Sequence, residues 1–205
     1  MEKLFITFEG IEGCGKSTQA KLLAEYLQNN NHQVVLTREP GGTNISEQIR
    51  SIILDPKNSE MTPETELLLY LAARNQHTAQ KIIPALNNKQ IVISDRYYDS
   101  TFAYQGVARK INYDKIIYMN SFATYNLIPD ITFIMDIPVS ESIKRIMHKK
   151  LDRLEQEPEE FHKNVRDAFL KLASKEKRFI ILNGMQSIEI IHQEIIDIIY
   201  SQFIK

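Results

Sequence analysis

A stretch of eight residues near the amino terminus has the residue types and spacing of a loop that binds nucleotide phosphates. Residues 10–17 read Gly-Ile-Glu-Gly-Cys-Gly-Lys-Ser, which fits the pattern G-x-x-x-x-G-K-[ST]. Glycines let the backbone wrap closely around an anion, so that several N–H groups point at it. The Lys16 ammonium would reach the β- and γ-phosphates of a triphosphate, and the Ser17 hydroxyl would bind Mg²⁺. The residues expected to contact the donor phosphates are Gly10, Glu12, Gly13, Cys14, Gly15, Lys16, Ser17 and Thr18.

The sequence on either side of the loop has the periodicity that such a site needs. Leu4–Phe8 is an apolar run typical of a buried strand, and Lys16–Asn30 carries leucines at helical spacing. A helix that begins at the loop adds a partial positive charge beside the phosphates. Because strand, loop and helix follow one another, we interpret the motif as a phosphate site rather than a plain glycine-rich turn.

A second polar motif, Arg38-Glu39-Pro40-Gly41-Gly42, follows the apolar run 33–37. An arginine at the end of a strand could bind a phosphate through its planar guanidinium group. The alternative is an ordinary turn with a solvated ion pair.

A third motif, Asp95-Arg96-Tyr97, ends the apolar run 90–94. A carboxylate at the end of a buried strand is where a protein with a phosphate loop holds Mg²⁺, often through water. Arg96 would then face the same phosphates. The alternatives are a helix-capping aspartate beside a surface arginine, and Asp136 as the carboxylate that holds the metal.

A basic run between 144 and 153 predicts a mobile lid over approximately 144–157 that brings cations to the transferring phosphates. The alternative is a solvated helix face. The cationic residues are Lys144, Arg145, His148, Lys149, Lys150 and Arg153.

Two groups of side chains on expected helices could line a pocket for a planar base. Tyr70 and Arg74 are four residues apart and so share a helix face, offering a ring and a donor group. A second group offers hydroxyls and an amide after Asp95. Its members are Ser100, Thr101, Tyr104 and Gln105. Taken alone, both groups also fit ordinary amphipathic helices.

Strands and helices are expected to alternate along the whole chain, which predicts a doubly wound α/β fold with a parallel sheet between two layers of helices. The expected strands are Leu4–Phe8, Gln33–Thr37, Gln90–Ser94, Ile131–Ile137 and Arg178–Leu182. The expected helices are Lys16–Asn30, Ser46–Leu54, Pro63–Leu86, Asp114–Tyr125, Val139–His148, Glu159–Lys175 and Ser187–Phe203. The carboxyl ends of parallel strands meet at one edge, where ligands bind. All three polar motifs follow strands, so we expect one site in a single domain over 1–205.

The composition limits the classes of function. The net charge of −1 over 205 residues implies no broad basic surface for nucleic acid. No run approaches the roughly 18 apolar residues of a membrane span. Glu2 and Lys3 lead directly into the first strand, unlike a secretory signal. One cysteine cannot form a disulfide within the chain. We therefore expect a cytoplasmic protein that binds neither nucleic acid nor membrane.

Taken together, the motifs resemble those of the thymidylate kinases, over most of the chain. The matching segments are the phosphate loop, Arg38 to Gly42, Leu69 to Arg74, Asp95 to Gly106 and Leu151 to Glu157. The resemblance implies a P-loop NTPase fold with a central five-stranded sheet and transfer of the γ-phosphoryl group of ATP to dTMP with Mg²⁺. It also implies a homodimer.

The resemblance assigns roles to individual residues. Those implied for catalysis are Lys16, Arg38, Asp95, Arg96 and Arg153, with Asp95 and Ser17 holding Mg²⁺. Those implied for dTMP are Glu12, Arg38, Glu39, Arg50, Tyr70, Arg74, Arg96, Ser100, Thr101, Tyr104 and Gln105. The variable loop positions carry no basic residue, so the cation at the transition state must come from the lid. Arg153 is the first candidate, followed by Lys149 and Lys150.

Two other functions remain as alternatives. The first is a kinase of another small acceptor, and an uncharged nucleoside would not need the phosphate-binding pair Arg38 and Arg96. The second is a regulatory GTPase. Such proteins usually carry Asn-Lys-x-Asp for guanine and Asp-x-x-Gly for the switch, and neither sequence occurs in this chain.

Overall fold

The computed structural model describes residues 3–204 and is built around one parallel β-sheet. The strands pair in parallel in the order β2-β3-β1-β4-β5. They are β1 (Leu4–Glu9), β2 (Val34–Arg38), β3 (Ile91–Asp95), β4 (Ile131–Asp136) and β5 (Phe179–Asn183). This arrangement confirms the five-stranded parallel sheet that the sequence predicts.

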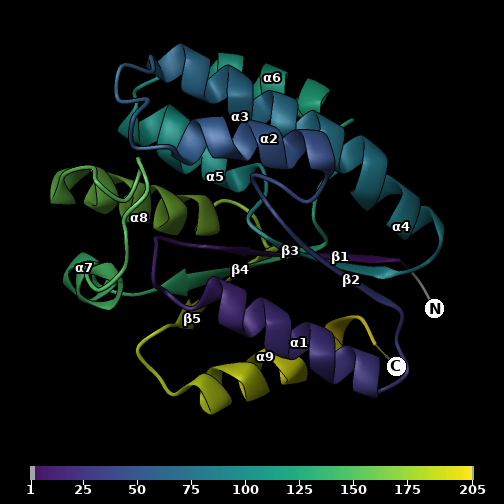
Figure 1. Cartoon of the computed structure of the whole chain (residues 1–205). Helices are drawn as coiled ribbons and strands as arrows, with labels where there is room; N and C mark the ends of the chain where they lie inside the picture. Colours follow the sequence, from purple (N-terminus) through teal and green to yellow (C-terminus); the bar gives the residue numbers. More distant parts are fainter. Residues whose placement is uncertain (1–2, 205) are drawn as a thin grey trace.

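Helices cover both faces of the sheet, with α1 and α9 on one face and α3, α4 and α8 on the other (Figure 1). The α-helices are α1 (Lys16–Asn29), α2 (Asn44–Leu54), α3 (Pro63–His77), α4 (Ile83–Asn87), α5 (Asp99–Thr101), α6 (Tyr113–Ala123), α7 (Val139–Ile146), α8 (Glu159–Ala173) and α9 (Ile188–Gln202). Two π-helical segments, η1 (Thr78–Ile82) and η2 (Phe102–Ala108), complete the described helices. The three layers confirm the doubly wound α/β fold.

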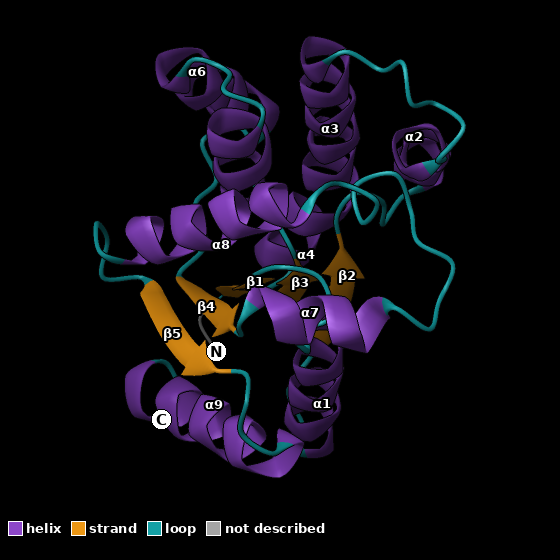
Figure 2. Ribbon diagram, turned by 90° about the vertical axis from the view of Figure 1, so that its left-hand side faces the viewer, coloured by secondary structure: helices purple, strands orange, loops and turns teal. Residues whose placement is uncertain are grey.

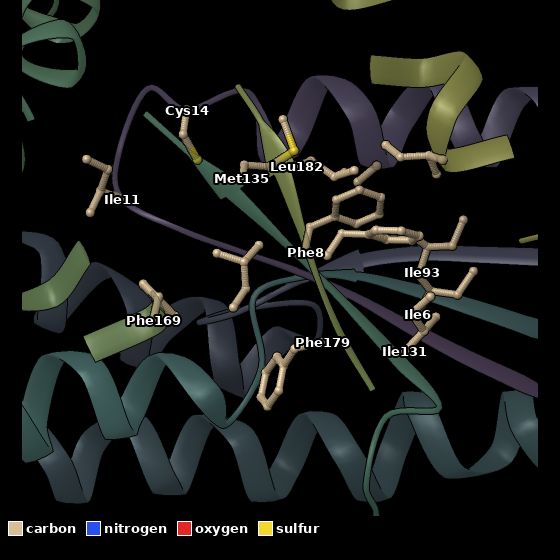
Figure 3. Packing of buried hydrophobic residues seen from close by; sticks show 14 of the residues in the cluster. Ile6, Phe8, Ile11, Cys14, Ile93, Ile131, Met135, Phe169, Phe179 and Leu182 are labelled. Atoms are coloured by element: carbon tan, nitrogen blue, oxygen red, sulfur yellow. The ribbon is translucent and has the colours of Figure 1, made fainter. Parts of the chain in front are cut away.

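The central strands β1, β3 and β4 are buried because they are apolar on both faces. All six residues of β1 are buried, as expected for a central parallel strand covered on each side. The rings of Phe8 and Phe133 lie 5.3 Å apart between centroids. Cys14 belongs to the same buried cluster as Met135 and Leu182 (Figure 3). The thiol therefore packs in the core, and Cys14 can contribute to a phosphate site through its backbone N–H.

The expected long helix over Pro63–Leu86 is interrupted. α3 ends at His77, and the π-helical segment η1 separates it from α4. Pro84 explains the change, because a proline has no N–H for the normal helical bond and its ring crowds the preceding turn. The helix expected over Val139–His148 also ends earlier, at Ile146.

The parallel strands bring their carboxyl ends to one edge of the sheet. The loop 10–15 follows β1 at this edge, and Asp95 and Arg38 end the adjacent strands β3 and β2 in register with each other. α7 lies in front of the sheet and α8 above it (Figure 2). Within residues 3–204, no helix is both long enough and apolar enough to cross a membrane.

Candidate active site

A cavity of about 350 Å³ at the carboxyl edge of the sheet gathers most of the predicted site residues. Its walls come from the phosphate loop, the ends of β2 and β3, helix α3, the segment after β3 and the segment 149–155. The predicted residues that line it are Glu12, Gly13, Lys16, Ser17, Arg38, Glu39, Arg50, Tyr70, Asp95, Arg96, Ser100, Tyr104, Gln105 and, from the expected lid, Lys149. The motifs that lie far apart in the sequence thus form one site.

A second cavity, of about 370 Å³, lies beside the phosphate loop. The loop residues Cys14 and Gly15 and the helix residue Thr18 line it, together with Arg145 and residues from the segment 184–188. Gly13 lines both cavities. The loop therefore borders two spaces at once, as a protein that brings two ligands to one phosphate group requires.

The backbone of the phosphate loop needs its glycines. Gly10 has a φ of 137°, and a Cβ there would lie 2.6 Å from the carbonyl oxygen of Met135. Gly15 has a φ of 100° and immediately precedes α1. The Lys16 ammonium donates to the carbonyl oxygen of Ile11 at 2.8 Å, so its side chain folds back along the loop. These features give the anion-binding loop predicted from the sequence.

The two groups expected to hold a metal ion lie together. The Ser17 hydroxyl, at the start of α1, donates a hydrogen bond to the Asp95 carboxylate at the end of β3. The alternative metal carboxylate, Asp136, is not at this cavity. Both of its oxygens accept hydrogen bonds from Arg166, at 2.7 and 2.9 Å. The geometry thus favours Asp95 over Asp136, because the second carboxylate is already neutralised by a guanidinium group.

Glu12 is held in the phosphate loop by two donors from the segment after β3. One of its oxygens accepts from Arg96 at 2.8 Å and from the Tyr104 hydroxyl at 2.6 Å. Burial alone would raise the pKa of the Glu12 carboxyl, but the Arg96 and Lys16 charges together with the hydrogen bonds from His162 and Tyr104 outweigh it and hold that pKa well below its usual range. Arg96 itself adopts a φ of 72°, a conformation that non-glycine residues rarely adopt. Glu12 is therefore an ionised carboxylate fixed at the wall of the cavity.

Two further arginines approach each other at the opposite wall. Arg38 is 55% exposed at its side chain and contacts Glu47 at 3.1 Å, while Arg50 donates to the carbonyl oxygen of Pro40 at 2.8 Å. Burial, followed by the neighbouring Arg38 charge, lowers the pKa of Arg50. Two guanidinium groups with one carboxylate between them leave a local positive charge that suits an anionic ligand.

Of the residues expected to contact a base, some lie at the cavity and others lie behind its wall. Tyr70 and Gln105 line the cavity, whereas Arg74 and Thr101 lie behind its wall. Arg74 is buried and uses four of its five N–H groups, on Glu39, Thr101, Asn120 and the carbonyl oxygen of Tyr97. In this conformation Arg74 hydrogen-bonds both Thr101 and the Glu39 carboxylate, and the expected contacts of these residues with a ligand stay predictions.

The expected lid cations separate into two kinds. Lys149 lines the cavity, with its ammonium 2.5 Å from Glu155. Arg153 does not line the cavity. It is buried, and its guanidinium group donates to Glu66 at 2.6 Å and to the carbonyl oxygen of Ile53 at 2.8 Å. In this conformation Lys149 lines the first cavity and Arg145 lines the second, beside the phosphate loop, whereas Arg153 faces neither; which lid cation acts on the phosphates stays a prediction.

Three buried residues near the site are missing from the sequence analysis. Glu9 ends β1, accepts from the Ser100 hydroxyl at 2.6 Å, and has its pKa raised to about 7 by burial. Its strand-end position, which identified Asp95, could have revealed it. Glu66 lies one helical turn before Tyr70 on α3. His162, for which the sequence carries no such signal, places a ring nitrogen 3.7 Å from Glu12.

Comparison with known proteins identifies the family of this chain. The family model described as "Thymidylate kinase" matches residues 8–195. The thymidylate kinase of Thermoanaerobacter sp. (strain X514) is 44% identical over 200 residues, which cover 97% of this chain and 98% of that protein. The thymidylate kinase of Geotalea uraniireducens (strain Rf4) is 48% identical over 193 residues, covering 90% and 91%. The crystal structure of thymidylate kinase from Ehrlichia chaffeensis superposes with a TM-score of 0.79 at 37% identity, covering 97% and 99% of the two chains. The chain described here therefore belongs to the thymidylate kinase family.

Proposed function

We propose that this protein is a dTMP kinase, which transfers the γ-phosphoryl group of ATP to dTMP and gives ADP and dTDP. The observation that carries the proposal is the shared cavity. It joins the phosphate loop, the Ser17–Asp95 pair, the arginines Arg38 and Arg50, and an aromatic and amide wall, in a member of this family. A phosphate-bearing acceptor fits the two arginines better than an uncharged nucleoside does.

The donor would bind along the phosphate loop, with its phosphates on the loop N–H groups and Lys16. The second cavity, which Gly15 and Arg145 line, is the space next to the loop in which the rest of ATP would lie. The acceptor phosphate oxygen is already ionised at neutral pH, so no strong general base is needed. The residues would act by holding donor and acceptor in line and by neutralising charge.

The residues that would hold Mg²⁺ are Ser17 and Asp95. Their hydroxyl and carboxylate oxygens are adjacent at the cavity and are the hard oxygen ligands that this ion takes. Residues 3–204 contain no cluster of three or more metal-ligating side chains. Such a sparse donor set suits an ion that keeps water and phosphate oxygens as its other ligands. When bound, the ion would neutralise charge between the β- and γ-phosphates.

The acceptor would lie against the opposite wall of the cavity. Its phosphate would bind Arg38 and Arg50, with Arg96 between the acceptor and the loop. Glu12 would accept from the sugar 3′-hydroxyl, and Tyr104 would crowd the 2′ position. Tyr70 would stack on the base, and the fifth N–H of Arg74 would be the one left for a base carbonyl.

The lid would supply the cation at the transition state through Lys149. Its ammonium is at the cavity wall and its side chain is 54% exposed, so it can move toward a transferring phosphate. A lysine delivers a point charge rather than the planar fork of an arginine. Arg153 would instead anchor the lid segment to helix α3.

The test is release of ADP from Mg·ATP with single acceptors: dTMP, dUMP, dCMP, dGMP, ribosyl-TMP and thymidine. We expect strong turnover with dTMP, weak turnover with dUMP and almost none with thymidine. Clear activity on another acceptor without turnover of dTMP would retain a phosphate-loop kinase and refute the assignment of the base wall.

We also propose that the protein forms a homodimer through α6 and the adjacent helix α3. Tyr118 and Phe122 are each 77% exposed, four residues apart on α6, and Leu68 on α3 is 55% exposed. An apolar face on two contacting helices is stabilised by burial against a second copy. Light scattering that gave the mass of one chain at micromolar concentration would refute this.

We place the protein in the cytoplasm, where its proposed substrates are, without nucleic-acid or membrane partners.

A further inference from the structure

Glu66 on α3 is a buried carboxylate that holds three side chains from two separate segments. Its side chain is 1% exposed. One oxygen accepts from the Gln105 amide nitrogen at 2.8 Å and from Arg109 Nε at 3.3 Å. The other accepts from Arg109 Nη2 at 3.1 Å and from Arg153 at 2.6 Å. Four donors thus converge on one carboxylate directly behind the cavity wall.

The charges of this group keep Glu66 ionised. Burial would raise the pKa of the carboxyl, but the hydrogen bonds from Arg109, Gln105 and Arg153 and the Arg109 charge lower it below its usual range. A carboxylate in this state has no proton to donate and can only accept hydrogen bonds. Gln105 must therefore turn its NH₂ group toward Glu66.

The opposite end of the same amide faces the cavity. Gln105 lines the cavity and Glu66 does not, so fixing the nitrogen on Glu66 leaves the carbonyl oxygen of Gln105 toward the ligand space. Among residues 3–204, no side chain donates a hydrogen bond to that oxygen. The wall thus presents an acceptor. A thymine ring offers an imide N–H to an acceptor, whereas the corresponding ring nitrogen of cytosine is itself an acceptor.

Both arginines also tie Glu66 to the segment that carries the expected lid. Arg153 belongs to that segment and donates to the carbonyl oxygen of Ile53 at the end of α2. Arg109 contacts Glu157 at 2.5 Å. The carboxylates of Glu66 and Glu157 balance the guanidinium groups of Arg109 and Arg153. Each oxygen of Glu66 accepts from a guanidinium group, which fixes the rotamer of its side chain.

We propose that Glu66 is a positioning residue that fixes the orientation of the Gln105 amide and thereby sets discrimination between thymine and cytosine in the acceptor. The proposal rests on the proposed dTMP kinase activity. Glu66 would touch neither substrate, and its effect would pass entirely through Gln105. A neutral partner at position 66 could donate as well as accept, so the Gln105 amide would lose its fixed orientation.

The experiment compares kcat/KM for dTMP and dCMP, with saturating Mg·ATP, in the wild-type protein, Glu66→Gln and Glu66→Asp. The aspartate keeps the charge for the arginines but is one methylene shorter and withdraws from Gln105, so it carries the test if the glutamine variant fails to fold. We expect the ratio of the two kcat/KM values to fall by about tenfold or more, the scale of one misdirected buried hydrogen bond.

Two controls separate positioning from a general loss of structure. Glu157→Gln removes a carboxylate from the same arginine without touching Gln105, and its ratio should match the wild type. In a Gln105→Met background, Glu66→Asp should produce no further change in the ratio. A folded Glu66→Asp protein with the wild-type ratio would overturn the proposal, as would a further fall in the Gln105→Met background. A wild-type protein inactive on dTMP would instead refute the proposed function.

Discussion

Substituting the lid cations Lys149 and Arg153 one at a time should affect different properties, catalytic turnover in the first case and stability in the second. In Lys149→Met, the protein loses a side chain that is 54% exposed and paired with Glu155. Glu155 is only 6% exposed but keeps the Asp152 N–H at 3.0 Å, so the free energy of unfolding should fall by about 1–2 kcal/mol, between the cost of breaking an exposed pair and that of breaking a buried one. If Lys149 supplies the transition-state cation, kcat should fall on the order of 10²–10³, with a smaller change in KM for ATP.

Arg153→Met should instead mainly affect stability. The change removes a guanidinium group that is 8% exposed and 2.6 Å from Glu66. Breaking a buried pair costs up to about 3–5 kcal/mol when it leaves a charge alone. Glu66 retains Arg109 at 3.1 Å, so we expect the lower end of this range, about 3 kcal/mol.

Guanidinium-induced unfolding and steady-state kinetics on the same preparations distinguish these outcomes. Each variant is assayed well below its unfolding midpoint, so that loss of folded protein does not imitate loss of catalysis. An Arg153→Met protein with unchanged unfolding free energy and a 10³-fold lower kcat would refute the reasoning, because the transition-state cation would then be Arg153.

Three further outcomes are expected. Asp95→Asn should lower kcat severely and raise the Mg²⁺ concentration needed for activity, whereas Asp136→Asn should leave the Mg²⁺ dependence unchanged; equal effects would contradict the metal assignment. Burial raises the pKa of Glu9 in the folded protein to about 7, from an ordinary value of 4.5. The folded state therefore keeps a proton that the unfolded chain releases, and stability should fall by about 3 kcal/mol as the pH rises from 4.5 to 7. Chemical unfolding at several pH values should show that Glu9→Gln lacks this fall. If the unfolding free energy of Glu9→Gln depended on pH as that of the wild type does, Glu9 would not be the group responsible. Phe122→Glu should shift the mass in solution from two chains to one, and an unchanged mass would exclude α6 as the interface.

Local sequence was sufficient for the parts of the molecule that are contiguous. The phosphate loop is specified by glycines within one segment, and its flanking strand and helix follow from periodicity. Because the carboxyl ends of parallel strands meet at one edge of a sheet, Arg38 and Asp95 were expected at the same edge. The two residues lie there in register with each other. The interrupted helix after His77 was missed, because a proline in a helical pattern allows several local solutions.

The pairing of buried charges was beyond local sequence. Arg153 and Glu66 are 87 residues apart, and Arg74 and Glu39 are 35 apart. From composition alone, Arg153 was as good a candidate for a phosphate as for a carboxylate. Only the packing of α3 against its neighbours decides which partner is within reach.

The sequence by itself determined the sheet, the phosphate loop and the edge at which the motifs meet, because each depends on periodicity or on backbone conformation within a few residues. The tertiary structure decided which cations face the cavity and which are neutralised behind it. Lys149 and Arg153 carry the same charge within five positions, yet one lines the cavity and the other is buried against Glu66. A charge buried away from water needs a partner at hydrogen-bond distance, and that distance is set by the folded chain.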